Sequence, residues 1–257
     1  LIICAMILVI GIFFAYLGKS FFKENFNYLY IVPHNKGITT APFWQAAVDW
    51  IWDTFFFSLK SFNEFLIINI LVPMKEAYLG MPVAATFLLV MGTAYILAGI
   101  RSAFIVAGFL LFIAFSEYWD RALITAYMTS FAVIVAAVLG ITVGSLCAQN
   151  NRSTKVILFI CDFFQTFPSF IYLIPVIMLF GITDTSVIIA AIVYALVPAT
   201  RYTVEGLRNV PAVLHDAGSM MGVSKLQRWL SIDLPLAFPH IMLGVNQTVV
   251  FSLFMVI

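Results

Sequence analysis

A series of apolar segments constrains this chain more than any other feature, because most are close to the ~20 residues that a helix needs to cross a bilayer. They cover residues 1–17, 82–99, 102–115, 122–148, 156–180, 186–203 and 236–257. Only 10% of the 257 residues are charged, whereas a soluble domain carries roughly 25%. We therefore predict an all-α membrane protein, a polytopic helical bundle. Since the chain starts and stops inside apolar segments, we also expect its C-terminus to be truncated.

The segments divide the chain into three predicted parts. Residues 1–18 are expected to form a first transmembrane helix, and residues 19–81 an amphipathic region at the membrane interface. Residues 82–257 are expected to form the transmembrane core, with a cytoplasmic loop at 206–235. The interface region is the one with the weakest membrane-spanning pattern.

Tryptophans support the prediction for the interface region. After a loop at 33–37, Trp44, Trp50 and Trp52 recur at helical spacing. This spacing is typical of a helix at headgroup level, where Trp is enriched, and the alternative is an aromatic ligand cage. The apolar stretch 65–74 is too short to cross a bilayer comfortably, so we expect it to continue along the interface.

Basic residues in the short connections predict the orientation. They gather at 149–155 and at 201–235, whereas the turn at 181–185 has neither Lys nor Arg. By the positive-inside rule the first two are cytoplasmic, which places residues 19–81 outside and the N-terminus inside. The lysines of 19–81 conflict with that assignment.

Within 156–180, Pro168 and Pro175 predict a kinked or interrupted helix.

Sequence motifs for catalysis are missing. The chain has no GxxxxGK[ST], GxSxG or HExxH pattern. Its histidines lie far apart, at His34, His215 and His240, and its cysteines form no CxxC pair. We therefore predict that the chain is not an enzyme, binds no metal and holds no cofactor. The net charge of +1 gives no reason to expect a nucleic-acid partner.

Ionisable residues at membrane depth are costly and need partners. Asp162 lies about two turns into an apolar segment, and Arg201 and Glu205 are spaced to pair on one helix face. Asp162 can also pair with Arg201 across the helix hairpin. These residues are predicted to form a structural polar clamp, with a role in transport as the alternative.

Other polar and aromatic groups are candidates for lining a solute pathway. Uncharged polar side chains in lipid must face protein or a water-filled path, and helix packing and pathway lining explain them equally well. The aromatic candidates flank the predicted kink at Pro168. The candidates are Phe164, Phe167, Phe170, Tyr172, Asn246 and Gln247.

A polar stretch at 210–235 carries a spaced motif. It reads Asp-Ala-Gly at 216–218, then Gly222, then Ile232, Leu234 and Pro235. The spacing resembles the "EAA" cytoplasmic loop of ABC importer permeases, E-A-A-x3-G-x9-I-x-L-P. Asp216 replaces the Glu, and Gly218 replaces the second Ala. The segments 165–182, 195–211 and 234–257 are similar to the glycine betaine/proline betaine permease subfamily.

The resemblance implies a MetI-like type I ABC importer fold in a bacterial cytoplasmic (inner) membrane. It further implies a homodimer with a second permease copy, two copies of an ATPase subunit that bind ATP and Mg, and an extracytoplasmic substrate-binding protein. The implied solute is glycine betaine, proline betaine, choline, carnitine or trimethylamine N-oxide. The alternative is an ion-coupled secondary transporter or channel without an ATPase, which would need its own coupling-ion site or filter.

The same resemblance implies which residues dock the ATPase: Asp216, Ala217, Gly218, Gly222, Ile232, Leu234 and Pro235. Asp216 is expected near the start of a short helix, where a carboxylate complements the helix dipole. The small residues let a partner approach the backbone closely. Gly222 is expected to end the helix in a left-handed conformation.

Overall fold

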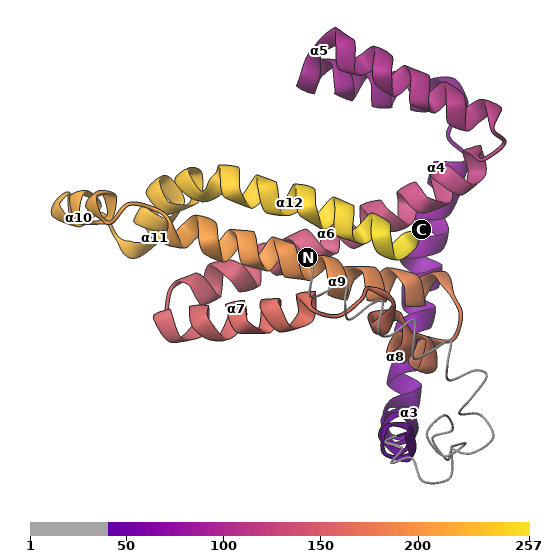
Figure 1. Ribbon diagram of the computed structural model, residues 1–257, viewed down its shortest axis with the longest axis horizontal. Coiled ribbons are helices and arrows are strands. Elements are labelled where there is room, and N and C mark those ends of the chain that lie inside the picture. Colours follow the sequence, from indigo (N-terminus) through magenta and orange to yellow (C-terminus); the bar gives the residue numbers. More distant parts are fainter. Residues whose placement is uncertain (1–40) are drawn as a thin grey trace, which may run out of the picture. The chain divides into compact units, whose positions relative to one another are not determined.

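The computed structural model describes residues 41–257, and the predicted first helix and the loop at 33–37 lie outside them. The described part is helical throughout, with short connections and no strand (Figure 1). Five of its helices are long and apolar enough to cross a membrane, or up to six if a bent pair is one span. The prediction of an all-α polytopic membrane protein is confirmed.

The helices follow one another in the order of their labels. They are α3 (Ala41–Leu66), the π-helix η3 (Ile67–Leu71), α4 (Val72–Leu79), α5 (Val83–Phe115), α6 (Trp119–Ala148), α7 (Asn151–Gln165), α8 (Phe170–Phe180), α9 (Asp184–Arg208), α10 (Ala212–Met220), α11 (Lys225–Arg228), the π-helix η4 (Trp229–Asp233) and α12 (Leu234–Val256).

The segment before the core is more continuous than the sequence predicts. Helices α3, η3 and α4 adjoin without a break, and Gln45–Leu79 is long and apolar enough to cross a membrane. The stretch 65–74 is therefore not a separate short segment, because η3 and its neighbours include it in a longer helix. The interfacial position of 19–81 stays a prediction.

Helix α5 is interrupted near its middle, as the sequence predicts. Gly99 has φ +79° and ψ −179°, which are not helical values, and a positive φ is a conformation that favours glycine. The interruption falls two residues before Arg101, where the apolar pattern ends and a new one starts.

The predicted helix over 156–180 is divided in two. Helices α7 and α8 meet at a break with a bend of 90°. Pro168 lies in the break and disfavours helical geometry at the residue before it, which confirms an interruption there. Pro175, by contrast, lies inside α8. The predicted loop at 149–155 is wrong in extent, because the Asn150 side chain caps α7 and most of the segment is helical.

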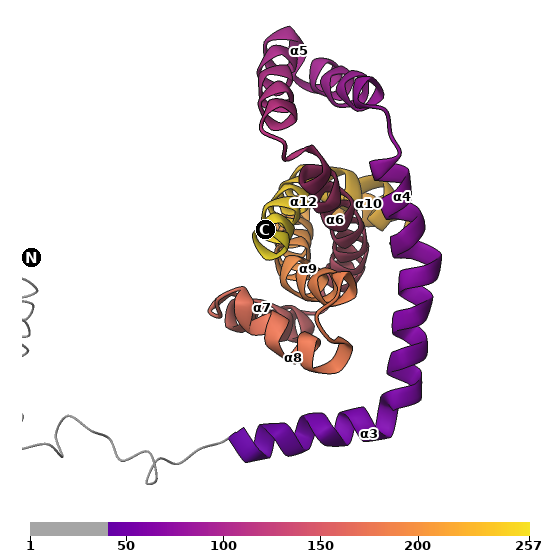
Figure 2. The same ribbon diagram turned by 90° about the vertical axis from the view of Figure 1, so that its right-hand side faces the viewer.

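Helices α6, α9 and α12 pack together and contain most of the core (Figure 2). Glycines make the close approach possible. A Cβ at Gly140 of α6 would lie 2.5 Å from the Ala199 Cβ of α9, and a Cβ at Gly244 of α12 would lie 2.7 Å from the Tyr202 Cβ. Small residues at helix contacts are typical of membrane proteins, where packing drives association. Helix α9 thus has close neighbours on two sides.

The two ends of α9 are fixed by different polar contacts. At its C-terminal end, Arg208 donates a hydrogen bond to Asn151 of α7. At its N-terminal end, Lys75 of α4 lies 3.2 Å from Asp184, which also accepts a hydrogen bond from Tyr127 at 2.5 Å. The basic stretches near 149–155 and 201–235 therefore meet at one end of the core, as the orientation argument requires.

The contacts of Asp184 predict a measurable loss of stability. We expect Asp184→Ala to lower the free energy of unfolding by about 1–3 kcal/mol, because it leaves the fully buried Tyr127 hydroxyl without its acceptor. Unfolding of the purified protein by denaturing detergent measures the change. Asp120→Ala is the control, because Asp120 also lies in the first turn of a helix but is exposed. Equal stability of the two variants would contradict the assignment.

Candidate functional site

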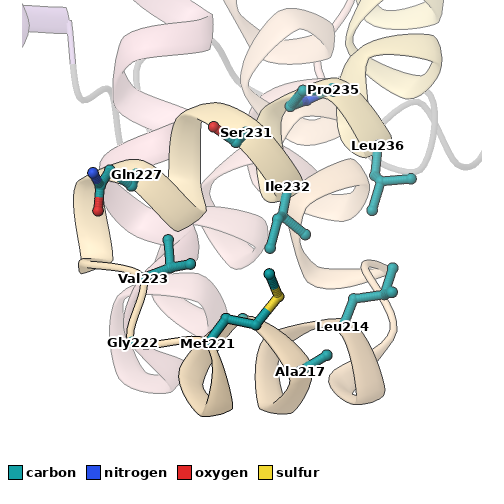
Figure 3. A pocket seen from close by; sticks show the side chains of 11 residues that line it. Leu214, Ala217, Met221, Gly222, Val223, Gln227, Ser231, Ile232, Pro235 and Leu236 are labelled. Carbon is teal, nitrogen blue, oxygen red and sulfur yellow. The ribbon is translucent and has the colours of Figure 1, made fainter.

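A groove lies between α10 and the helices that follow it (Figure 3). Its volume is about 840 Å³. Side chains from α10 form one wall, and side chains from α11, η4 and the start of α12 form the other. The lining residues are Leu214, Ala217, Gly218, Met221, Gly222, Val223, Gln227, Ser231, Ile232, Pro235 and Leu236. We call this feature the docking groove.

The shape of the docking groove follows from how α10 ends. Gly222 has φ +74°, and the Val223 amide donates to the Gly218 carbonyl at 3.2 Å. This is the bond of a Schellman motif, in which glycine takes the left-handed position. The chain then reverses, and Ser224 starts α11 with a capping box that includes Gln227. The predicted left-handed conformation of Gly222 is confirmed.

The two walls of the docking groove approach each other closely at Gly218. A Cβ at Gly218 would lie 3.1 Å from the Ile232 Cδ1. Gly218 is buried, so a side chain there would require the Ile232 side chain to shift by a few tenths of an ångström. Gly218, which stands where the resembled motif has Ala, therefore lies in close contact with the opposite wall.

The structure brings most of the predicted docking residues together. Ala217, Gly218, Gly222, Ile232 and Pro235 all line the docking groove, whereas Leu234 does not. The expected place of Asp216 is wrong, because it lies in the middle of α10 and not near its start.

Sequence reasoning missed the larger apolar residues of the groove. Leu214, Met221, Val223 and Leu236 also line it. Leu214 and Met221 lie one turn on either side of the motif's small residues, so helical spacing from Ala217 and Gly218 could have found them. Met is suited to adaptable contact surfaces.

One helix connects the groove to the membrane core. Helices α11, η4 and α12 adjoin, and Lys225–Val256 satisfies the length and hydropathy of a membrane span. Within η4 the buried Asp233 carboxylate lies 3.6 Å from the Arg228 guanidinium of α11. An ion pair in this position links successive turns across the π-helix.

A second, more polar pocket lies between α7, α9 and α12. Its volume is about 400 Å³, and its lining residues are Gln165, Pro198, Arg201, Tyr202, Glu205, Gln247 and Phe251. We call it the polar pocket. Its polar side chains come from α7, α9 and α12, so any relative movement of these helices changes its shape.

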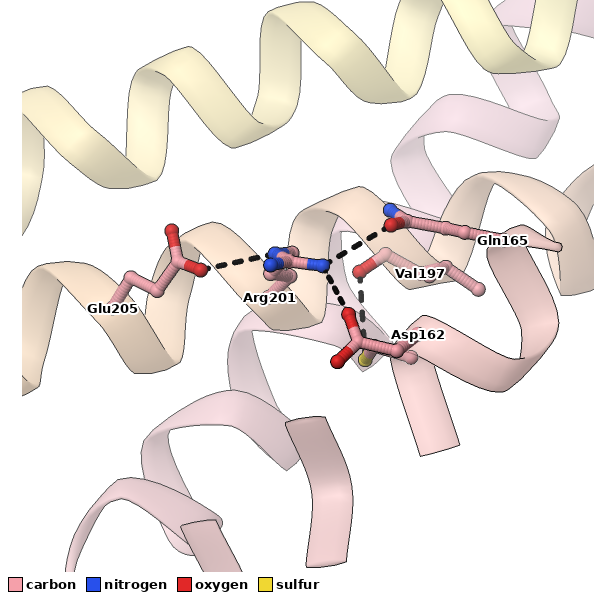
Figure 4. A network of polar contacts seen from close by, with 6 residues as sticks. Asp162, Gln165, Val197, Arg201 and Glu205 are labelled. Carbon is pink, nitrogen blue, oxygen red and sulfur yellow. Dashed lines mark hydrogen bonds and ion pairs between the residues drawn. The ribbon is translucent and has the colours of Figure 1, made fainter. Parts of the chain in front are cut away.

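Arg201 is the centre of a network beside the polar pocket (Figure 4). Its Nη1 donates to Asp162 Oδ1 at 2.5 Å and to Gln165 Oε1 at 3.2 Å, and its Nε donates to Glu205 Oε1 at 3.0 Å. The structure thus brings the predicted clamp residues Asp162, Arg201 and Glu205 into contact. All are partly exposed, so the ion pairs themselves contribute little to stability.

Aromatic rings continue from the polar pocket toward the break between α7 and α8. Phe251 stacks on Tyr194 with centroids 4.8 Å apart, and Tyr194 contacts Tyr172 at 5.4 Å. Tyr172 stacks on Phe164 at 5.9 Å and donates a hydrogen bond to its carbonyl oxygen. Tyr194 and Phe251 are the members that sequence reasoning missed, because they lie on α9 and α12, away from Pro168.

The other predicted pathway residues divide between two environments. Phe167 joins the aromatic residues through Phe163, at 5.0 Å, and Gln247 lines the polar pocket. Phe170 is 70% exposed, and Asn246 is exposed outside the lining of the polar pocket. The structure therefore does not bring Phe170 and Asn246 to the same place as the others.

The sequence that forms these two sites is similar to known transport-system proteins. Residues 140–257, from the second half of α6 onward, match the family described as "Binding-protein-dependent transport system inner membrane component". The glycine betaine/proline betaine transport system permease protein ProW of Escherichia coli is 32% identical over 91% of this chain and 66% of its own length. Residues 140–257 belong to this family. As a permease-family protein with several membrane-spanning helices, the chain is a multi-pass inner-membrane protein with a MetI-like domain.

Other relatives are more similar but longer. The trimethylamine N-oxide transport system permease protein TmoV of Pelagibacter ubique is 60% identical over 98% of this chain and 35% of its own length. The TmoV protein of Ruegeria pomeroyi is 42% identical over 77% of this chain and 30% of its length. The chain therefore spans about a third of the length of those two relatives.

Proposed function

We propose that the chain is the membrane-spanning part of an ATP-driven importer for small methylated amines. The docking groove carries this proposal. It presents an apolar surface between two short helices at the end of the core where α7 and α9 meet. The positive-inside rule makes that end cytoplasmic, which is where an ATPase subunit would bind.

The proposed division of labour follows from what the chain contains. Its family is a transport-system component, and its sequence has no phosphate-binding loop. A separate ATPase subunit would therefore bind ATP and Mg and hydrolyse the nucleotide. We propose two such subunits on a pair of permease copies, with an extracytoplasmic binding protein that delivers the solute.

The proposed solute class comes from the relatives and from the aromatic rings. Curated relatives are named for the transport of trimethylamine N-oxide and of glycine betaine. These solutes carry methylated nitrogen, which is attracted to aromatic faces. Trimethylamine N-oxide is the preferred proposal, because the relative with 60% identity is named for it.

Co-purification and uptake test the proposal together. The full-length permease is produced with an ABC ATPase and a binding protein from the same organism, purified through a tag on the permease, and reconstituted in vesicles. We expect the ATPase to co-purify, and ATP to drive uptake of labelled trimethylamine N-oxide more strongly than of choline. Uptake that needs an ion gradient and no ATPase would instead establish a secondary transporter.

A further inference from the structure

The polar pocket combines acidic charge with aromatic surface. Arg201 is the cation of its network, whereas Asp162 and Glu205 are both carboxylates, so the network has a formal charge of −1. Charges in partly dehydrated surroundings act more strongly than in water. A solute group with positive charge is therefore favoured over an anion.

Two of the three guanidinium nitrogens of Arg201 are already engaged by groups of the protein. Its Nε and Nη1 both donate to groups of the protein, and Nη1 serves two acceptors. Glu205, by contrast, gives one oxygen to Arg201, and Figure 4 shows the other oxygen turned away from it. Arg201 and Glu205 both line the pocket, and Asp162, which pairs with Arg201 from outside the lining, gives the network one negative charge in excess.

The aromatic part of the pocket has a fixed orientation. Phe251 lines the pocket and stacks on Tyr194, at a centroid distance of 4.8 Å and an interplanar angle of 29°. Tyr194 is held in turn by Tyr172. A ring supported in this way offers an electron-rich surface to a ligand. Because its orientation is already fixed, binding costs little side-chain conformational entropy.

We propose that the polar pocket binds the methylated ammonium group of the transported solute. Glu205 supplies the negative charge, Phe251 supplies the aromatic surface, and Arg201 holds Glu205 in place. The volume of about 400 Å³ suits a small solute. The proposal rests on the proposed function and adds to it a binding site inside the permease, separate from the binding protein.

Tetramethylammonium is the probe, because it carries the proposed group and nothing else. Its binding to the purified full-length permease–ATPase complex is measured without binding protein, by saturation-transfer NMR with titration. We expect Glu205→Gln and Phe251→Leu each to weaken binding roughly 3- to 30-fold. Glu205→Asp and Phe251→Tyr, which keep the charge and the ring, are expected to retain most of the affinity.

Matched controls separate the site from general damage. Phe254→Leu makes the same change at a residue of α12 that is 65% exposed and does not line the polar pocket. Glu64→Gln removes a distant exposed carboxylate of α3. Both are expected to bind tetramethylammonium as the unchanged complex does.

The possible results separate the two proposals. No binding to the unchanged complex, equal binding by Phe251→Leu and Phe254→Leu, or displacement of the probe by acetate would each overturn the binding site. Such a result would leave the importer proposal intact if ATP still drove uptake. If the unchanged complex showed no ATP-driven uptake, the importer proposal itself would be wrong.

Discussion

Ala217→Trp is expected to reduce ATP-driven uptake at least about 30-fold while the protein still inserts and folds. Ala217 is exposed and lines the docking groove, so an indole there occupies the space that we assign to the ATPase. The loss of a central contact at a protein interface costs about 2 kcal/mol or more, which corresponds to that factor. Uptake of labelled trimethylamine N-oxide into vesicles and co-purification of the ATPase measure the effect.

Met220→Trp is the matched control for this change. Met220 belongs to the same helix and is 89% exposed, but it does not line the docking groove. The same ring at this position should leave uptake and co-purification within a factor of two or so of the unchanged complex. If Ala217→Trp also transported normally, the ATPase would have to bind elsewhere, and our interpretation of the groove would be wrong.

Gly140→Leu is expected to destabilise the core by about 3 kcal/mol, toward the upper limit for overpacking. A Cβ at Gly140 would lie 2.5 Å from the Ala199 Cβ and 3.0 Å from the Thr200 amide nitrogen. One of these contacts is with backbone, which cannot rotate away, so α6 and α9 would have to separate. The midpoint of unfolding in denaturing detergent measures the loss.

Gly108→Leu is the comparison for the glycine change. Gly108 also lies inside a helix, but a Cβ there has no neighbour within 4 Å. Leucine is a better helix former than glycine, so this variant should be as stable as the original or slightly more stable. A similar loss in both variants would mean that the cost comes from the substitution itself and not from the contact with α9.

The sequence predicted much of the fold because lipid permits few alternatives. Backbone groups in hydrocarbon must be paired, so apolar segments of sufficient length become helices. That argument located α6, α9 and α12 and the interruption at Gly99. The same argument does not predict where a helix begins or ends when its end lies in a polar segment. The segment 149–155 is polar, yet the Asn150 cap lets α7 start there.

The residues of the docking groove could be predicted in part from the sequence, for a different reason. Its small residues and Pro235 stand at fixed spacing, and a spacing can be read without coordinates. The position of Asp216 within α10 could not be predicted from the sequence, because it depends on the residue at which that helix starts. The polar pocket was harder still. Helical spacing paired Arg201 with Glu205, and the predicted helix hairpin paired Asp162 with Arg201. Tyr194 and Phe251 meet only through the packing of α9 on α12.

The unbroken helix from Lys225 to Val256 carries residues of both sites: Gln227 faces the docking groove and Phe251 the polar pocket. At 1.5 Å per residue, Phe251 lies about 28 Å along the axis from Ile232. If this rod tilts by about 5° at its cytoplasmic end, Phe251 is displaced by roughly 2.5 Å. A displacement of that size is enough to separate Phe251 from a bound methyl group. ATP-driven closure of the partner subunits would then tilt the helix from Lys225 to Val256, and this tilt would move Phe251 away from the solute.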